Sequence, residues 1–259
     1  MPHPLSPTEI LAASGGDRYV QAAVGNGTVG DAWAADGALV WVNASHGRTR
    51  FSGVGPPAAA ARLLAQVRDQ VPAATRASLP RGWLAHLPTT VTATPLADWD
   101  WLWTTTPPPQ LAAEDRARRL TVADLPAVRT LLEESSPGTS TWPGDDAAVR
   151  WAGLVAADGS LAACLADTSR SAAVGHISSV ATAHAHRRNG YGAALTAWTT
   201  RGLLAEGKSA VTLGMYADND AARALYLRLG FACDHAFTAA ELTGDRAPAV
   251  SASGCGTGT

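Results

Sequence analysis

The sequence predicts an α/β (α+β) protein in which a mixed central sheet is flanked by helices. An apolar, β-branched run at 174–180 precedes a helical pattern that begins at Tyr191. A second apolar run, 211–216, precedes another helical pattern at 219–230. The first half of the chain also contains both strand and helix patterns, so both kinds of element are expected throughout.

The first half is expected to contain a hairpin and a helix. Strand patterns at 29–33 and 39–43 are joined across Asp36-Gly37, a dipeptide typical of two-residue hairpin turns. The alanine-rich stretch 58–70 follows two prolines and predicts a helix, because proline favours the first helical turn.

Three alternating tryptophans predict a strand before a run of three prolines at 107–109. Alternation places Trp99, Trp101 and Trp103 on one face, where we expect them to pack between the two halves of the chain. The prolines lack backbone donors and favour extended structure, so we place a domain boundary there. The expected units are an N-terminal domain at 1–110, a second domain at 111–243 and a flexible tail at 244–259.

The second half begins with an expected short strand at 120–122 and an amphipathic helix at 124–134. Apolar runs at 151–157 and 161–166 predict a hairpin across an Asp-Gly turn. The two strand–helix pairs described above follow, and a last strand completes the order.

A basic loop that contains glycine connects the strand at 174–180 to the helix that begins at Tyr191. The first N–H groups of a helix have no partner within it, and the helix dipole adds partial positive charge there. Gly190 and Gly192 let a phosphate approach the backbone, and Arg187 adds charge. The loop therefore predicts a site for a phosphorylated ligand, most simply a pyrophosphate.

The second strand–helix pair carries the pattern Asn-x-x-Ala-x-x-Leu-Tyr-x-x-Leu-Gly-Phe from Asn219 to Phe231. Asn219 is expected to cap this helix and Gly230 to end it. Together the loop and this helix resemble motifs A and B of the GNAT acetyltransferase superfamily, in which motif A grips the pyrophosphate of acetyl-coenzyme A (acetyl-CoA). The resemblance covers roughly residues 115–243 and implies the GNAT fold.

The chain also resembles the glycine N-acyltransferase-like branch, which pairs an active GNAT half with a diverged N-terminal half. This resemblance implies that the N-terminal domain is a smaller, degenerate GNAT-like half without a cofactor loop. Residues 53–55, before the helix at Pro56, are the nearest counterpart of that loop and contain no arginine.

The resemblance also implies which residues hold acetyl-CoA as cosubstrate. The end of the first strand would face the pantetheine arm, and the loop and helix start would hold the pyrophosphate. The implied binding residues are Val180, Ala181, Thr182, Arg187, Arg188, Asn189, Gly190, Tyr191, Gly192, Ala193, Asn219 and Ala222. Arg188 stands where glycine is frequent, so it either contacts the 3′-phosphate or lies in solvent.

Two residues are candidates for the chemistry. Tyr226 matches the family tyrosine that donates a proton to the departing sulfur, and its alternative is an amphipathic core role. His176 has a reference pKa suited to a general base, and its alternative is a structural role on the strand. Glu133 and Glu134 either attract a cationic amine or form a solvated helix end, and Trp142 lies in the loop that borders the acceptor side in the family.

Composition limits the partners. A formal net charge of −2 over 259 residues argues against nucleic acid or an anionic membrane. Cys164, Cys233 and Cys255 are scattered, which suits a reducing, cytoplasmic compartment and predicts neither disulfides nor a metal site. No signal-peptide pattern is visible, and no apolar run approaches the ~18 residues of a membrane span. The expected state is a monomer or homodimer.

Two nucleotide-binding patterns fail on their context. Residues 202–209 satisfy the P-loop pattern, but a P-loop runs from a strand into a helix, and this stretch is expected to run from a helix into a strand. Residues 25–30 satisfy the dinucleotide pattern, but a hairpin rather than a helix is expected to follow.

The expected activity is therefore the transfer of an acetyl group from acetyl-CoA to a primary amine of a small molecule or peptide, by direct attack on the thioester. The alternative is a non-catalytic acyl-CoA-binding module that acts as a sensor or structural partner. The sequence does not choose the acceptor.

Overall fold

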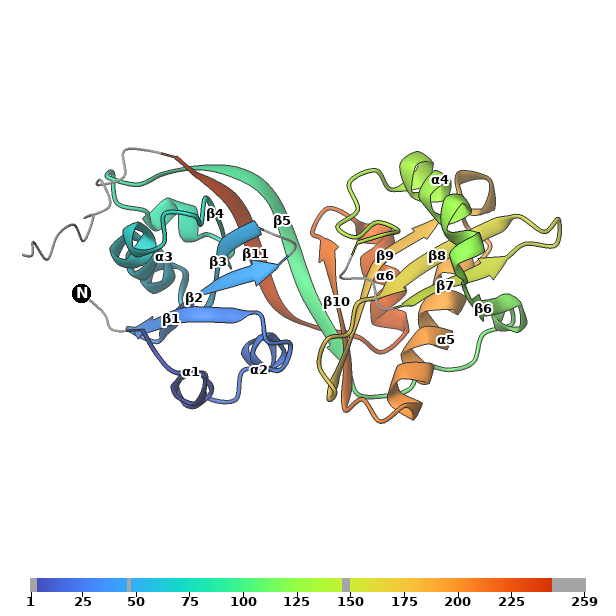
Figure 1. The fold of residues 1–259 in the computed structure, drawn as a ribbon, viewed down its shortest axis with the longest axis horizontal. Helices are drawn as coiled ribbons and strands as arrows, with labels where there is room; N and C mark the ends of the chain where they lie inside the picture. The colour runs from blue at the N-terminus through green and yellow to red at the C-terminus, as the bar shows by residue number, and fades with distance from the viewer. Residues whose placement is uncertain (1–3, 46–47, 146–149, 244–259) are drawn as a thin grey trace, which may run out of the picture.

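A single mixed sheet runs through the whole molecule. The computed structural model describes residues 4–45, 48–145 and 150–243. Within them, an 11-stranded sheet has the order β1-β2-β3-β4-β11-β5-β10-β9-β8-β7-β6. Figure 1 shows two groups of elements, each with its own helices, joined by the long strands β5 and β11. The predicted fold class, a mixed sheet flanked by helices, is confirmed.

The first group holds three α-helices and five strands. The helices are α1 (Pro7–Ala13), α2 (Arg18–Gly25) and α3 (Pro57–Val67). The strands are β1 (Val29–Ala35), β2 (Ala38–Ser45), β3 (Arg48–Val54), β4 (Arg76–Pro80) and β5 (Thr92–Thr104). The expected hairpin joins β1 to β2, and its turn residues Asp36 and Gly37 both have positive φ, 51° and 77°.

The second group holds the remaining three α-helices and six strands. The helices are α4 (Leu125–Ser135), α5 (Tyr191–Ala205) and α6 (Asp220–Arg228). The strands are β6 (Ala117–Arg119), β7 (Arg150–Val155), β8 (Leu161–Asp167), β9 (Val174–Thr182), β10 (Ala210–Tyr216) and β11 (Ala232–Thr243).

The prediction of a short strand at 120–122 was wrong, because the strand lies three residues earlier. The strand is β6 at Ala117–Arg119, and residues 122–124 form a helical turn instead. Asp124 explains the difference, because its carboxylate accepts hydrogen bonds from the backbone N–H and the hydroxyl of Thr121. This capping box starts a helix at the point where the strand had been expected.

The two long strands β5 and β11 connect the two groups through their strand pairings. β5 pairs antiparallel with β10 of the second group on one edge and with β11 on the other. β11, the last strand of the chain's described part, also pairs with β4 of the first group. The sheet therefore continues unbroken past the proline triplet, and the domain limits at residues 110 and 243 stay a prediction.

Helices of the second group cover opposite faces of the sheet. On one face α5 and α6 bury Leu195, Leu203 and Tyr226 against Ile177 and Leu213. On the other face α4 packs its apolar side chains against residues of β7 and β8, namely Val128, Leu131 and Leu132 against Trp151, Cys164 and Ala166. Helices thus cover both faces of the strands β8 and β9.

The three alternating tryptophans lie on one face of β5, as expected. Trp99 stacks on Phe237 of β11 with ring centroids 4.5 Å apart, and Trp101 lies 5.5 Å from Tyr19 of α2. The guanidinium of Arg18 sits 3.9 Å from the centre of the Trp103 ring. These contacts fasten α2 and β11 to the strand that links the two groups.

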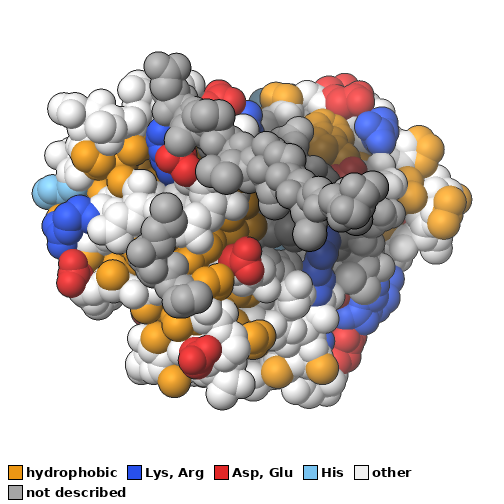
Figure 2. All heavy atoms as spheres, turned by 60° about the vertical axis from the view of Figure 1, so that its left-hand side comes forward, with side chains coloured by type: hydrophobic (Ala, Val, Ile, Leu, Met, Phe, Trp, Pro, Cys, Tyr) orange, Lys and Arg blue, Asp and Glu red, His pale blue; other side chains and the backbone are white. Residues whose placement is uncertain are grey.

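The surface mixes charges of both signs. Figure 2 shows acidic and basic side chains interspersed with apolar ones on the visible face, which agrees with the small net charge. Among the described residues, no helix is both long and apolar enough to cross a membrane. The same residues contain no group of three or more His, Cys, Asp or Glu side chains that could hold a metal ion.

Candidate active site

The two parallel strands β9 and β10 separate halfway along their length. They pair from Val174 with Ala210 up to Ile177 with Leu213. Beyond that point β9 continues to Thr182 and β10 to Tyr216, and no ladder pair joins these described ends. An edge of β9 that includes the predicted residues Val180 and Thr182 therefore faces a gap between the strands. Backbone groups on such an edge can pair with an extended ligand.

A β-bulge at Ser179 lies at the mouth of this gap. The register between β8 and β9 shifts by one residue between Ser178 and Ala181, and Ser179 has a φ of 52°. A bulge re-aims the backbone locally and often occurs beside functional sites. Sequence reasoning missed this residue, because nothing in an apolar strand pattern marks where a bulge falls.

The bulge also holds the loop 136–145 that follows α4. The Ser179 hydroxyl accepts hydrogen bonds from Thr139 Oγ1 (2.7 Å) and Thr141 N (3.2 Å) and donates one to Thr141 O (2.9 Å). On the other side of the gap, the Tyr216 hydroxyl of β10 donates to the carbonyl of Gly138 at 3.2 Å. The loop therefore contacts both strands that border the gap.

The predicted phosphate loop ends at a helix terminus that no side chain caps. Gly190 is the N-cap residue of α5, and no side-chain cap hydrogen bond is present there. Arg188 and Gly190 have φ values of 64° and 76°, and a Cβ at Gly190 would have nothing within 4 Å. The first N–H groups of α5 are thus left for a ligand, in open space and at the positive end of the helix dipole.

Gly192 fulfils a different requirement from Gly190. A Cβ at Gly192 would lie 3.0 Å from the Thr182 hydroxyl and 3.8 Å from Leu225 of α6. Its missing side chain therefore lets α5 approach the end of β9 and the neighbouring helix closely. The structure brings together three segments that the sequence separates: the end of β9, the start of α5 and α6.

Other side chains of the loop bind neighbouring elements. The guanidinium of Arg187 donates to the carbonyls of Ser135 (3.2 Å) and Thr182 (3.4 Å). His184 Nε2 lies 2.9 Å from the carbonyl of Glu134, and Asn189 donates to the carbonyl of His186. These contacts tie the loop to the C-terminal end of α4, while the predicted residue Arg188 is exposed.

The helix α6 starts and packs as the sequence predicts. The side chain of Asn219 accepts a hydrogen bond from the backbone N–H of Ala222 at 3.0 Å, so these two predicted residues form its N-terminal cap. Tyr226 is buried on the face shared with α5, 5.9 Å from the ring of Phe231. Burial raises the pKa of the Tyr226 phenol to about 12. The phenol is therefore protonated at neutral pH and able to donate a hydrogen bond.

His176 lies on the opposite face of the sheet from Tyr226. It is two residues before Ser178 on a regular stretch of β9, and the Ser178 hydroxyl donates to Thr141 of the loop. Its neighbour Ile177 points instead to the face that carries α5 and Tyr226. Burial lowers the pKa of His176 to about 4, and Asp167 raises it by a smaller amount. The imidazole is neutral at neutral pH.

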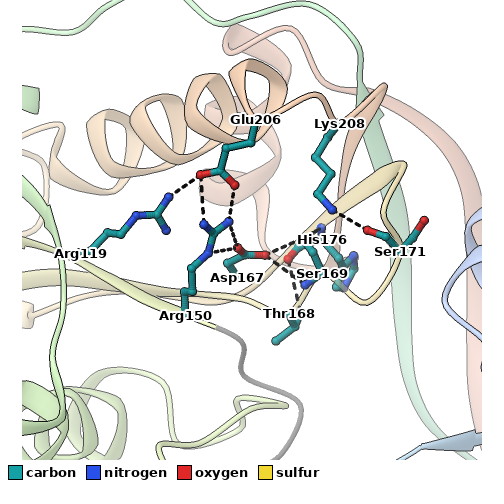
Figure 3. Close-up of polar contacts among 9 residues, drawn as sticks. All are labelled: Arg119, Arg150, Asp167, Thr168, Ser169, Ser171, His176, Glu206 and Lys208. Atoms are coloured by element: carbon teal, nitrogen blue, oxygen red, sulfur yellow. Dashed lines mark hydrogen bonds and ion pairs between the residues drawn. The ribbon is translucent and has the colours of Figure 1, made fainter.

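A network of charged residues reaches the backbone of His176 through Ser169 (Figure 3). Glu206, next to the C-terminal end of α5, pairs with both Arg119 and Arg150, and Arg150 also pairs with the buried Asp167. Asp167 in turn accepts from the hydroxyl of Ser169, which accepts from the backbone N–H of His176 at 2.9 Å. This network connects β6, β7, β8 and α5, and no sequence pattern marked it.

Three further candidates from the sequence lie at the end of α4 and in the loop that follows it. The side chains of Glu133 and Glu134 are exposed at the end of α4. Trp142 packs on the α4 side of the core, with the guanidinium of Arg129 5.8 Å from its ring. A partly open pocket of about 130 Å³ lies beside Arg150, Asp167 and Trp198, away from the gap.

Comparison with known proteins identifies this arrangement. The profile of the Acetyltransferase (GNAT) family matches residues 97–231, from β5 through α6. The chain belongs to the GNAT acetyltransferase family. The match contains the separated strands, the uncapped start of α5 and the helix of Tyr226, so membership supports acetyl transfer as the general activity.

Solved structures share the fold over nearly the whole chain. A GNAT N-acetyltransferase from Sphaerobacter thermophilus is 17% identical, with a TM-score of 0.60 over 93% of this chain and 94% of its own. One from Kribbella flavida is 19% identical, with a TM-score of 0.57 over 88% and 95%. A tandem GNAT protein from the clavulanic acid biosynthesis pathway is 15% identical, with a TM-score of 0.53 over 92% and 96%. None of the curated proteins compared with this GNAT chain matches it.

Proposed function

We propose that this GNAT protein is an acetyl-CoA-dependent N-acetyltransferase that acts on a primary amine of a small molecule or peptide. One observation carries the proposal: the gap between β9 and β10 leads to the uncapped start of α5. An extended pantetheine arm suits the first feature, because it can pair with a free strand edge. A pyrophosphate suits the second, because helix N-termini bind anions.

The proposed binding site consists of residues that were predicted from the sequence. Val180, Ala181 and Thr182 end β9 beside the gap. The backbone from Arg187 to Ala193 holds the pyrophosphate, with the open space at Gly190 receiving it. Because the Arg187 guanidinium is already bonded to two carbonyls, its contribution is to shape the loop, and Arg188 supplies the free positive charge.

The two catalytic candidates lie on opposite faces of the sheet. His176 is on the paired stretch of β9 just before the gap, and Tyr226 is on α6. In the proposed reaction the amine nitrogen attacks the thioester carbonyl carbon, the C–S bond breaks, and the coenzyme A thiolate leaves. His176 lies on the same face as Ser178, which donates to Thr141 of the loop 136–145. It takes the proton that the amine loses as the C–S bond breaks, because the nitrogen is then becoming an amide and is acidic enough to protonate an imidazole with a pKa of about 4. Tyr226, on the other face, assists the departing sulfur.

The raised pKa of Tyr226 determines whether it transfers a proton to the departing thiolate or only donates a hydrogen bond to it. A thiol has a pKa of about 8.5, so complete transfer of a proton from a phenol with a pKa of about 12 is uphill. The phenol therefore stabilises the thiolate as a hydrogen-bond donor. In this proposal a backbone N–H near Val180 or Ala181, just after the Ser179 bulge, polarises the thioester carbonyl, as oxyanion donors do in acyl transfer.

We further propose that the N-terminal group is a diverged GNAT half, as in the glycine N-acyltransferase-like branch. It repeats one connection of the second group: β3 is antiparallel to β2 and, after α3, parallel to β4. The loop before α3 is filled, however, since a Cβ at Gly55 would lie 2.7 Å from Ala38 Cα. The start of α3 therefore lacks the open space found at Gly190.

Binding and turnover can be tested separately. Calorimetry with acetyl-CoA tests the site, and release of free thiol in the presence of a panel of primary amines tests catalysis. Thiol release that requires an amine supports the enzyme. Binding without release from any amine favours the alternative, a non-catalytic acyl-CoA-binding module. The free thiols Cys164 and Cys233 suit the proposed cytoplasmic location.

A further inference from the structure

The hydrogen bonds around His176 define which ring nitrogen carries its proton. Nδ1 of His176 lies 2.8 Å from the hydroxyl oxygen of Thr212 on β10. The same hydroxyl lies 3.0 Å from the backbone carbonyl of Gly175. Both are hydrogen-bonding distances, and the hydroxyl has a single hydrogen to give.

Only one assignment satisfies both contacts. The Gly175 carbonyl is an acceptor and cannot donate, so the Thr212 hydroxyl must donate to it. The Thr212 oxygen then has only lone pairs left for His176, and Nδ1 must be the donor in that contact. The reverse assignment would leave the Gly175 carbonyl and the Thr212 oxygen facing each other with no hydrogen between them.

We infer that Thr212 is a positioning residue that holds His176 in the Nδ1–H tautomer and leaves the Nε2 lone pair as its proton acceptor. Nε2 makes no hydrogen bond to any residue that the structure describes. The catalytic consequence rests on the proposed function, in which His176 accepts the proton of the amine. The tautomer itself does not, because the fixed contacts alone determine it.

The surroundings keep the imidazole neutral, which a tautomer requires. Asp167 on the neighbouring strand β8 is the acidic group that acts on the ring, and it is already paired with Arg150. Across β10 the ring faces the uncharged Thr212, whose partner on β5 is Trp103. The cation above that tryptophan is Arg18 of α2. Burial outweighs the acid, so the neutral ring dominates at neutral pH.

The tautomer can be measured without any substrate. The whole chain is labelled with ¹⁵N in its histidine rings, and the ring correlations are recorded near pH 7. The chain has 7 histidines, so a His176→Gln variant identifies the His176 signals by their loss. We expect Nδ1 of His176 to give the protonated nitrogen signal. A protonated Nε2 in the wild type would overturn the inference before any further variant is made.

Two variants at one position test the role of Thr212. Thr212→Ser keeps the hydroxyl and should keep the Nδ1–H tautomer and most of the turnover. Thr212→Val keeps the shape, loses the hydroxyl, and should shift the ring signals toward the Nε2–H tautomer. It should also lower kcat by about tenfold or more, part of the roughly 10²- to 10⁴-fold that general base catalysis contributes, with the KM for acetyl-CoA unchanged.

The outcomes separate this inference from the proposed function. Unchanged ring signals in a folded Thr212→Val chain would overturn the inference. Wild-type signals of the Nδ1–H form in a chain that releases no thiol with any amine would support the tautomer and contradict the enzyme. Loss of turnover in both variants with unchanged ring signals would show that Thr212 acts on the strand and not on His176.

Discussion

Gly190 and Gly207 stand at opposite ends of helix α5 in matching surroundings. Gly190 is the N-cap residue, and Gly207 directly follows the C-cap residue Glu206. Their φ values are 76° and 94°, and a Cβ at either position would have nothing within 4 Å. A side chain therefore meets similar backbone strain and similar free space at both ends, while only Gly190 borders the proposed phosphate site.

Gly190→Asp should weaken acetyl-CoA binding by at least tenfold in calorimetry, because it adds bulk and negative charge where the phosphate must approach. Gly207→Asp is the matched control and should leave affinity unchanged. Equal affinities for the two variants would place the pyrophosphate elsewhere. Gly192→Asp should also weaken binding, but its side chain would press on Thr182, so a loss of folding has to be excluded by its thermal melt.

Tyr226→Phe should lower kcat while leaving the affinity for acetyl-CoA nearly intact. The phenyl ring keeps the packing against Phe231, and only the hydroxyl is lost. Loss of one hydrogen-bond donor to developing negative charge typically lowers the rate by roughly 10²- to 10³-fold. The measurement is thiol release at saturating acetyl-CoA, with calorimetry on the same sample. A folded variant with wild-type kcat would show that the thiolate departs without this residue.

One molecule of acetyl-CoA should bind per chain. The start of α3 lacks free space, because Gly55 lies against the turn between β1 and β2. Calorimetric titration of the wild type should therefore give a stoichiometry of one, and Gly190→Asp should weaken that single event. A second binding event that survives in the Gly190→Asp variant would contradict the prediction and point to the N-terminal group.

His176 should make the folded protein less stable in acid. Its pKa is lowered to about 4 in the folded state, against 6.5 when exposed, so only the unfolded chain binds this proton between those values. Stability should therefore fall as the pH drops from about 6.5 to about 4, by up to about 3 kcal/mol.

A His176→Gln variant isolates this effect, since other groups titrate equally in both chains. Urea unfolding at pH 7 and pH 4.5 should show a smaller loss of unfolding free energy in the variant than in the wild type. Equal losses in the two proteins would mean that the imidazole is charged as easily in the folded state as in water.

Local patterns allowed the elements of the proposed acetyl-CoA site to be predicted. The start of α5 at Gly190 and the cap of α6 at Asn219 each depend on residues within about one helical turn. A pattern in the sequence therefore specifies them directly. The start of α1 has a similar local pattern, because Ser6 and Glu9 form a capping box, but this helix was not predicted. The helix α2 and the strands β3 and β4 were also not anticipated.

Long-range features could not be predicted in the same way. The bulge at Ser179 depends on how β8 and β9 align, and the Thr212–His176 contact depends on the register of β9 against β10. The charged network around Asp167 joins residues from four elements. Pairings of this kind are set by the packing of the whole sheet, which a single sequence does not display.

The position of β11 between β4 and β5 has a consequence for how the chain is made. Ribosomal synthesis runs from the N-terminus, so β4 and β5 emerge long before the strand that separates them. Until then each presents an open edge, which is a template for pairing with other chains. Contacts so distant along the sequence also slow folding, since a long loop must close first. The edges of β4 and β5 that β11 covers therefore stay open until β11 has been translated, and pairing with other chains has to be avoided during that interval.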